Sequence, residues 1–371
     1  MKKRVVIAGL GDTGLLVALG LSRGHEVIGI TPRPALVSGQ EVGLRVSRPN
    51  DWRKSYLMAF SRYRALRDAR VCQGLVERLE LSQHQLVVRR ADDTLETLSY
   101  DALILAPGVT NGFWRSAALE TREQVERSID ETASALARAS SIAVIGGGVT
   151  GVSAASNLKE THPSKRVVLV FGHELLPGYH PRVRAAAHER LVAQAVELKP
   201  GHRARVPDGF HGERLTHAPV EFSTGQPALE TDVVLWATGA GEPNTGFVPP
   251  QLLDERGFLR VDPQLRVLGH ENVFAVGDAA ATDPNRSSAR NGGAQLVAHN
   301  VRKLLQGRAD ELETYRPSPH RWGSIFGVQR DGLRVFAPGG SSFRISPFWV
   351  RNVVFPWIVA RGIYSGIDAE R

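Results

Sequence analysis

Short apolar runs alternate with helical segments along most of the chain, and their spacing predicts the order of the main elements. An apolar run at residues 5–8 leads into a glycine-rich turn and then into an apolar helical segment at 15–21. The same order of strand, turn and helix returns at residues 141–160. Strands that alternate with helices in this way predict an α/β fold built on parallel sheets.

Other segments complete this prediction. Residues 74–98 alternate between apolar and polar positions, which predicts a small antiparallel meander. Helical propensity predicts one helix over residues 50–69 and another over roughly 292–305. Further strands are expected at 25–31, 101–108, 166–171, 232–239 and 272–278.

The turn after the first strand has the spacing Gly9-x-Gly11-x-x-Gly14. In a strand–turn–helix context this spacing is typical of dinucleotide binding. Gly9 permits the tight turn, Gly11 lets a pyrophosphate approach the backbone, and Gly14 lets helix and strand pack closely. The helix that follows then directs unpaired N–H groups at the phosphates.

A second turn of this kind follows the strand at residues 141–145, with Gly146, Gly148 and Gly151 at the same spacing. Each of the two glycine turns is followed later in the chain by a strand of the form Asp–apolar run–Ala-x-Gly. These two strands end at Gly108 and Gly239. The chain therefore contains two nested dinucleotide-binding units. A later strand ends in Gly277-Asp278, where a carboxylate can bind a polyol chain beside a pyrophosphate.

Both units lack the acidic residue that usually ends the second strand and holds the adenosine ribose. Thr31 stands at this place in the first unit, followed by Pro32 and Arg33. A threonine can make one hydrogen bond to the ribose but cannot act as a charged double acceptor. In the second unit Phe171 takes the place of the acid, which removes the usual repulsion of a 2′-phosphate; Arg166 and His173 are candidate contacts for one.

Composition narrows the functional classes. Hydrophobic residues make up 42% of the chain and charged residues 23%, as in an ordinary soluble protein. A single cysteine, Cys72, excludes a dithiol redox pair, and the histidines show no metal-ligand spacing, so we expect no metal. Residues 50–69 interleave basic and aromatic positions, but one such helix without a known module does not indicate nucleic-acid binding.

The positive charge is concentrated near the end of the chain. Residues 314–367 hold seven arginines and one acid, so they carry +6 of the net charge of +8. Residues 346–367 also hold five aromatic side chains. Interfacial segments combine these features, so this segment is expected either to contact an anionic membrane or to pack against the first unit.

The motifs together resemble the two-dinucleotide-binding-domain flavoproteins of the pyridine nucleotide-disulfide oxidoreductase superfamily, without the dithiol. The resemblance covers residues 1 to about 312 and is nearest to the branch of apoptosis-inducing-factor-like proteins, ferroptosis suppressors and type II NADH:quinone dehydrogenases. It implies two nested Rossmann-like domains and a small C-terminal domain. The FAD domain is expected at 1–110 and 240–312, the NAD(P)H domain at 111–239, and a basic, aromatic C-terminal domain at 313–371.

The resemblance also implies the cofactors and their contacts. The residues expected to bind FAD are Gly9, Gly11, Gly14, Thr31, Arg33, Pro107, Gly108, Gly277 and Asp278. Those expected to bind NADH or NADPH are Gly146, Gly148, Gly151 and Gly239. Lys54 is expected near the flavin by the same analogy. Ser153 departs from the quinone dehydrogenases, which carry a glutamate shortly after the second glycine turn.

The function expected from these features is that of an FAD-dependent NAD(P)H:acceptor oxidoreductase whose acceptor is a quinone-like small molecule. Two alternatives remain open at this point: a flavin-binding signalling or scaffold protein with little turnover, and a reductase of a ferredoxin-like carrier. We expect a cytoplasmic location. If residues 346–367 contact a membrane, the protein is expected to lie peripherally on its inner face. The sequence does not indicate an oligomeric state.

Overall fold

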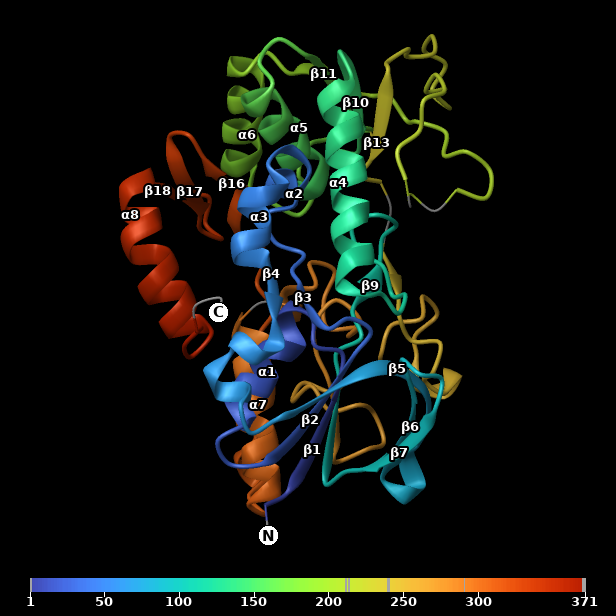
Figure 1. Cartoon of the computed structure of the whole chain (residues 1–371), viewed down its shortest axis with the longest axis vertical. Coiled ribbons are helices and arrows are strands. Elements are labelled where there is room, and N and C mark those ends of the chain that lie inside the picture. Colours follow the sequence, from blue (N-terminus) through green and yellow to red (C-terminus); the bar gives the residue numbers. More distant parts are fainter. Residues whose placement is uncertain (1, 211, 213, 239–240, 290, 369–371) are drawn as a thin grey trace.

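The structure is a computed structural model that describes residues 2–368, except 211, 213, 239, 240 and 290. The view in Figure 1 shows an elongated molecule with the amino terminus at one end. Two separate sheets with their helices make up its two ends, and the carboxyl-terminal segment lies along one side.

The first sheet forms around β1 (Arg4–Ala8). Because side chains alternate along a strand, Val5 and Ile7 face α1 (Asp12–Leu21) and α7 (Asn291–Leu305), whereas Val6 and Ala8 pack on the opposite face. The strand order is β15-β8-β1-β2-β5-β6-β7. The other strands are β2 (Glu26–Thr31), β5 (Arg70–Glu80), β6 (Gln85–Arg90), β7 (Leu95–Ser99), β8 (Ala102–Leu105) and β15 (Val273–Ala275).

Strands β5, β2, β1, β8 and β15 run parallel in the order of a doubly wound dinucleotide fold. The predicted meander is also present, since β5, β6 and β7 pair antiparallel.

The second sheet repeats this plan with all strands parallel, in the order β12-β11-β10-β13. Ile142 and Val144 of β10 face the helices, and Ala143 and Ile145 face the chain between 204 and 229. The strands are β10 (Ser141–Ile145), β11 (Arg166–Val170), β12 (Glu197–Lys199) and β13 (Val233–Trp236), and the helices are α4 (Arg122–Arg138), α5 (Val149–Thr161) and α6 (Pro181–Ala193). The prediction of an α/β fold with two Rossmann-like units is confirmed.

The predicted helix over residues 50–69 is wrong in its second half. Only α3 (Pro49–Tyr56) is helical, and β4 (Leu57–Ala59) then pairs antiparallel with β3 (Ala35–Val37). Pairing with a distant strand overrides the helical propensity of these residues. A short helix, α2 (Val42–Ser47), lies between these strands in the sequence.

The carboxyl-terminal segment forms the antiparallel sheet β16 (Gly323–Gln329), β17 (Gly332–Phe336) and β18 (Ser342–Ile345). It then continues as α8 (Pro347–Trp349) and η7 (Val350–Ile363). Pro356 lies inside η7, and the helix continues past it to Ile363.

Short elements complete the described chain. They are β9 (Val109–Thr110) paired with β14 (Glu242–Pro243), and the single turns η1 (Phe60–Arg62), η2 (Arg64–Leu66), η3 (Leu81–Gln83), η4 (Pro250–Leu252), η5 (Ser287–Ala289) and η6 (Ala309–Glu311).

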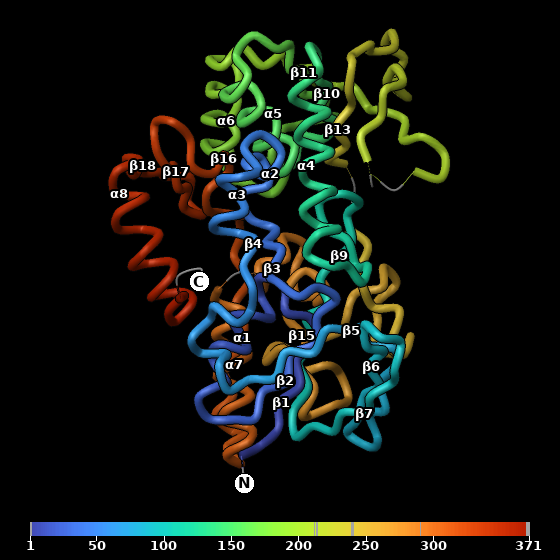
Figure 2. The backbone as a smooth tube through the Cα atoms, in the orientation of Figure 1, coloured from blue at the N-terminus to red at the C-terminus, as the bar shows by residue number. Residues whose placement is uncertain are grey.

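Helix α2 belongs to the first unit in sequence but packs on α5 of the second (Figure 2). Gly43 makes this possible, because a Cβ at this position would lie 2.4 Å from the carbonyl oxygen of Ser153. Strand β16 also packs on α5. We call this contact the α2–α5–β16 cluster.

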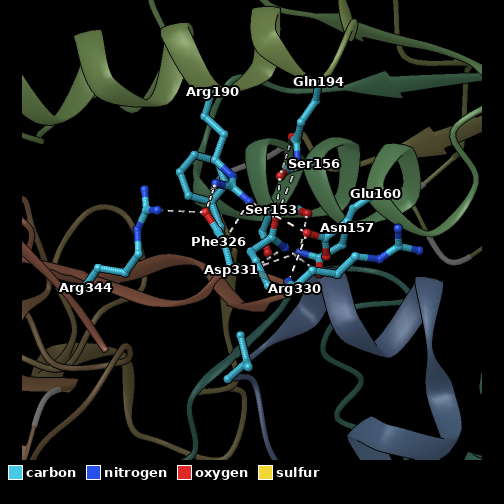
Figure 3. A network of polar contacts seen from close by, with 12 residues as sticks. Ser153, Ser156, Asn157, Glu160, Arg190, Gln194, Phe326, Arg330, Asp331 and Arg344 are labelled. Atoms are coloured by element: carbon cyan, nitrogen blue, oxygen red, sulfur yellow. Dashed lines mark hydrogen bonds and ion pairs between the residues drawn. The ribbon is translucent and has the colours of Figure 1, made fainter. Parts of the chain in front are cut away.

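A buried polar network fastens β16 to α5 and α6 within this cluster (Figure 3). Asn157 donates to the carbonyl oxygen of Phe326 at 2.8 Å and accepts from Gln329 Nε2 at 2.9 Å. Arg190 donates to Gln329 Oε1 at 2.9 Å and pairs with Asp331. Further members are Ser156, Glu160, Gln194, Arg330 and Arg344. The network therefore sets where β16 lies relative to the second nucleotide-binding unit.

Candidate active site

The first glycine turn has a distinct physical reason at each glycine. Gly9 has φ +107°, and a Cβ there would lie 2.1 Å from the carbonyl oxygen of Ala106. A Cβ at Gly14 would lie 1.9 Å from the carbonyl oxygen of Gly9. A Cβ at Gly11 would meet nothing within 4 Å, because this residue borders open space. Gly9 and Gly14 therefore build the turn, and Gly11 leaves room for a ligand.

The second turn repeats the first almost atom for atom. Gly146 has φ +130°, and its Cβ would lie 2.4 Å from the carbonyl oxygen of Ala237, while that of Gly151 would lie 1.9 Å from Gly146. Gly148 again borders open space. Neither α1 nor α5 has a side-chain cap at its N-terminus, so their first N–H groups remain available to a phosphate.

One cleft of about 1810 Å³ connects the two turns. Single small-molecule sites typically measure roughly 300–1,000 Å³, so this cleft has room for more than one ligand. Most of the predicted site residues line it: Gly9, Gly11, Gly14, Thr31, Arg33, Pro107, Gly108, Gly148, Gly277 and Asp278. Gly146 and Gly151 are not among the residues that line it, and Gly239 is outside the described residues.

Lys54 does not line the cleft. Its side chain is 74% exposed and lies 3.4 Å from Asp51 on the outer face of α3. The next two residues, Ser55 and Tyr56, are the ones of this helix that reach the cleft. The structure gives no support to a position for Lys54 beside a flavin.

A carboxylate from a distant segment of the chain lies near the end of β2. Thr31 is buried, and its hydroxyl oxygen accepts a hydrogen bond from the N–H of Arg33. Arg33 Nε in turn donates to Glu120 Oε2 at 2.8 Å. Since Glu120 belongs to the segment between the two sheets and lines the cleft, it supplies an acidic group close to the missing one.

Asp278 lies at the carboxyl edge of the first sheet and forms an ion pair with Arg115. Its carboxylate raises the pKa of Arg115. Asp12 lies close to the same guanidinium and accepts the N–H of Gly39 at 2.8 Å. Burial raises the pKa of Asp12, although the hydroxyl of Ser38, the N–H of Gly39 and Arg115 act in the opposite direction.

Hydrogen bonds from Asn244 fix the backbone of the cleft at the end of the first Ala-x-Gly strand. Asn244 donates to the carbonyl oxygen of Pro107 at 3.0 Å, and its N–H donates to that of Gly108 at 3.1 Å. Gly108 has φ +70° and borders open space. Gly277 has φ +90°, and its carbonyl oxygen accepts from Ser288.

In the second unit, Arg166 does not lie where a contact with a 2′-phosphate would require it. Arg166 begins β11 and pairs with Glu197 at 2.9 Å, so it lies at the amino end of the strand, away from the edge that carries Phe171 and His173. The expectation of a contact between Arg166 and a 2′-phosphate is therefore wrong. His173 is exposed at the correct edge, and Glu174 beside it is paired with Arg184.

Part of the cleft has an apolar wall contributed by the C-terminal segment, and we call it the apolar arm. Val354, Phe355, Val359 and Ile363 of η7 line it together with Tyr56 and Gly327. The rings of Phe355 and Tyr56 lie 6.3 Å apart at 77°, an edge-to-face contact. Glu41, which immediately precedes α2, also lines the cleft here.

The five aromatic side chains of residues 346–367 divide between the two expected roles. Phe355 contacts Tyr56, and Tyr364 is buried against Tyr63 with ring centroids 5.4 Å apart. Phe348, Trp349 and Trp357 are instead 61%, 56% and 57% exposed. Within the described residues, none of the helices has both the length and the apolar character needed to cross a bilayer.

Glu41, Arg115 and Glu120 are among the charged residues of the cleft that the sequence did not indicate. Each lies in a segment without regular pattern, and the partners of Arg115 and Glu120 are far away in sequence. A lone arginine or glutamate in a loop has no spacing that marks it as part of a site.

Comparison with known proteins identifies the family to which this arrangement belongs. The family model for pyridine nucleotide-disulphide oxidoreductase matches residues 3–302. The chain is 27% identical to ferroptosis suppressor protein 1 of Xenopus tropicalis over 322 residues, which are 85% of this chain and 83% of that protein. It is 25% identical over 350 residues to Fe-regulated protein 8 of Mycosarcoma maydis, covering 88% and 83%.

Solved structures share the fold at lower identity. NDH2 from Plasmodium falciparum superposes with a TM-score of 0.73 at 13% identity, covering 98% of this chain and 96% of that one. A CoADR-RHD from Bacillus anthracis gives a TM-score of 0.66 at 18% identity, covering 95% and 63%. Two glycine turns of one geometry, a shared cleft and a family match over most of the length lead to one conclusion. The chain belongs to the pyridine nucleotide-disulphide oxidoreductase family, whose members are NAD(P)H-dependent flavoenzymes.

Proposed function

We propose that the chain is an FAD-dependent NAD(P)H oxidoreductase that reduces a quinone-like acceptor. The observation that carries this proposal is the single cleft of about 1810 Å³, which joins both glycine turns to the apolar arm. When bound, FAD would accept hydride from NAD(P)H and pass on its electrons. A planar apolar acceptor fits the arm because aliphatic and aromatic side chains line it.

We assign the first turn to FAD. Gly11 and the free N-terminus of α1 would hold the pyrophosphate, with Asp278 at the ribityl chain. Thr31, Arg33, Pro107, Gly108 and Gly277 would form the rest of this site. Arg115 would exchange its partner Asp278 for a phosphate, since a guanidinium fits two phosphate oxygens at once.

We assign the second turn to NAD(P)H, with Gly148 and the N-terminus of α5 at its pyrophosphate. The Plasmodium falciparum NDH2 structure is a complex with NADH, which supports a site for a nicotinamide nucleotide in this fold. We propose use of both nucleotides, because Phe171 leaves no negative charge at the strand end to repel a 2′-phosphate. The proposed domains remain 1–110 with 240–312, 111–239 and 313–371.

We further propose that the protein reaches its acceptor at an anionic membrane surface. Phe343, Phe348, Trp349, Trp357 and Ile358 are exposed next to Arg344, Arg351 and Arg361. The guanidinium of Arg361 lies 4.0 Å from the ring centroid of Trp357. Aromatic side chains beside arginine are the composition that interfacial segments use.

The test begins with the FAD-loaded protein under anaerobic conditions. Mixing with NADH or with NADPH is expected to bleach the flavin band, with kcat/KM values for the two nucleotides within about tenfold. A soluble quinone is then expected to restore the band. Bleaching by neither nucleotide would refute the proposal. A steady-state rate no higher than that of free FAD would favour the scaffold alternative, and rapid reoxidation by ferredoxin without quinone activity would favour the carrier alternative.

Sedimentation with vesicles tests the membrane contact. Vesicles with anionic lipid are expected to bind the protein more than neutral ones, and Trp349→Ser with Trp357→Ser is expected to abolish the difference. Leu95→Ser is the matched control, since Leu95 is 63% exposed on β7 outside this segment. Equal binding by all three proteins would refute a docking role for residues 346–367.

A further inference from the structure

Glu41 is held in an unfavourable backbone conformation. It precedes α2 with φ 53° and ψ 40°, in the left-handed region that residues with a Cβ rarely adopt. Such conformations persist only where the surrounding structure imposes them, and they are common at functional sites.

A glycine on the C-terminal sheet makes room for its carboxyl group. Gly327 has φ +71°, and a Cβ there would lie 1.4 Å from Glu41 Oε2. Any other residue at this position would therefore displace the carboxyl group. Gly327 lies between Phe326 and Gln329, which Asn157 of α5 holds by hydrogen bonds, so three separate parts of the chain determine where this group lies.

The carboxyl group has few partners. Its Oε2 is buried and accepts no hydrogen bond in the described part of the chain. The charged and titratable groups that face it are Arg48, which lies between α2 and α3, and Tyr56 on α3, and from β16 it receives only the backbone N–H of Val328. Burial raises the pKa of Glu41 to about 7, against the opposing effects of Val328 and Arg48.

Glu41 also borders the place where an acceptor would enter. It lines the same cleft as Gly327, Tyr56 and Phe355, which belong to the apolar arm. A carboxyl group that can exchange its proton near neutral pH, beside an apolar site, has the property that a general acid needs.

Resting on the proposed function, we propose that Glu41 is a catalytic acid that protonates the quinone-like acceptor as it is reduced. Reduction of a quinone to a quinol takes up two electrons and two protons. NAD(P)H supplies a hydride, which brings both electrons and one proton. The Glu41 carboxyl group donates the second proton to an acceptor oxygen as the carbonyl double bond is lost, and the resulting carboxylate regains a proton from water.

The test compares two acceptors for the FAD-loaded protein. A soluble quinone takes up protons, whereas ferricyanide takes up electrons alone. Glu41→Gln is expected to slow quinone reduction on the order of a hundredfold, since general acids typically contribute at least that much. Ferricyanide reduction and flavin bleaching by NAD(P)H are expected to stay at the wild-type rate. Quinone reduction by the wild type is expected to fall above pH of about 7, and that by Glu41→Gln to be independent of pH there.

Glu41→Asp and the protein without FAD serve as controls. The aspartate variant retains a titrating group and is expected to recover part of the quinone rate with its pH dependence. Without FAD, the melting temperature of the wild type is expected to fall between pH 5 and 7, and that of Glu41→Gln to fall less, which reports the proton on Glu41 independently of turnover.

Two results would overturn the proposal for Glu41. One is a quinone rate and pH profile for Glu41→Gln equal to those of the wild type. The other is an equal loss with quinone and ferricyanide, which would indicate a structural role. A wild type that reduces ferricyanide but no quinone would overturn the proposed function, and this proposal with it, and the wild-type curve alone identifies that case.

Discussion

In each glycine turn the middle glycine, Gly11 or Gly148, borders open space, which allows the two nucleotide sites to be impaired one at a time. We expect Gly11→Ala to weaken FAD binding while the protein remains folded. We expect Gly148→Ala to leave FAD binding intact and to weaken NAD(P)H binding. The matched comparison is Gly14→Ala, whose Cβ would lie 1.9 Å from the carbonyl oxygen of Gly9, so that the turn itself must distort.

The structure gives the expected size of both effects. Gly11 has φ −73° and ψ −169°, which alanine adopts freely, and no atom lies within 4 Å of its Cβ. Loss of a glycine N-cap and the lower entropy of the unfolded chain oppose each other at about 0.5–1 kcal/mol each, so stability changes by less than about 1 kcal/mol. One lost hydrogen bond to a charged phosphate costs about 1.5–3 kcal/mol, which weakens binding about 10- to 150-fold.

Three measurements check this prediction. Quenching of flavin fluorescence on titration of the apoprotein gives the FAD affinity, stopped-flow bleaching gives the NAD(P)H dependence, and thermal unfolding reports the fold. Wild-type FAD affinity in Gly11→Ala would refute the reasoning. Loss of FAD rather than NAD(P)H in Gly148→Ala would reverse the assignment of the two turns.

Three further substitutions test other parts of the argument. Gln329→Met leaves Asn157 with an unmet buried acceptor and is expected to lower the free energy of unfolding by about 2–4 kcal/mol in urea titrations, whereas Gln83→Met on the surface leaves it unchanged. Gly43→Ala drives a methyl group into α5 and should cost at least about 1–3 kcal/mol by the same measurement; a neutral result would contradict the close contact. In the protein without FAD, the carboxyl of Glu41 has a higher pKa folded than unfolded, so the folded state binds more protons and stability falls as pH rises from about 4.5 to about 7. This loss of stability between the two pH values amounts to about 3 kcal/mol. Glu41→Gln is expected to abolish it, so the melting temperature of the variant should depend less on pH.

The glycine turns could be predicted from the sequence because only glycine meets the backbone requirements at these positions. Gly9 must have positive φ, and Gly14 must have no Cβ, so their spacing reports the turn directly. The parallel order of the strands follows from the alternation of strands and helices. The family resemblance then supplied the cofactors.

The charged part of the site could not be read in this way. Arg115 meets Asp278 across 163 positions of sequence, and Glu120 meets Arg33 across 87. Such pairs depend on how two finished units are placed, which no local pattern encodes. The strand at Leu57–Ala59 was missed for the same reason, because its partner β3 lies outside any window that propensity examines.

The α2–α5–β16 cluster also constrains the order in which the chain can assemble during synthesis. The first sheet is complete only when β15 and α7 have been made, and α2 finds its partner α5 more than 100 residues after itself. The second sheet, in contrast, is continuous in sequence from β10 to β13. The unit that begins second is therefore expected to fold first and to provide the surface on which α2, and with it the FAD site, comes into place.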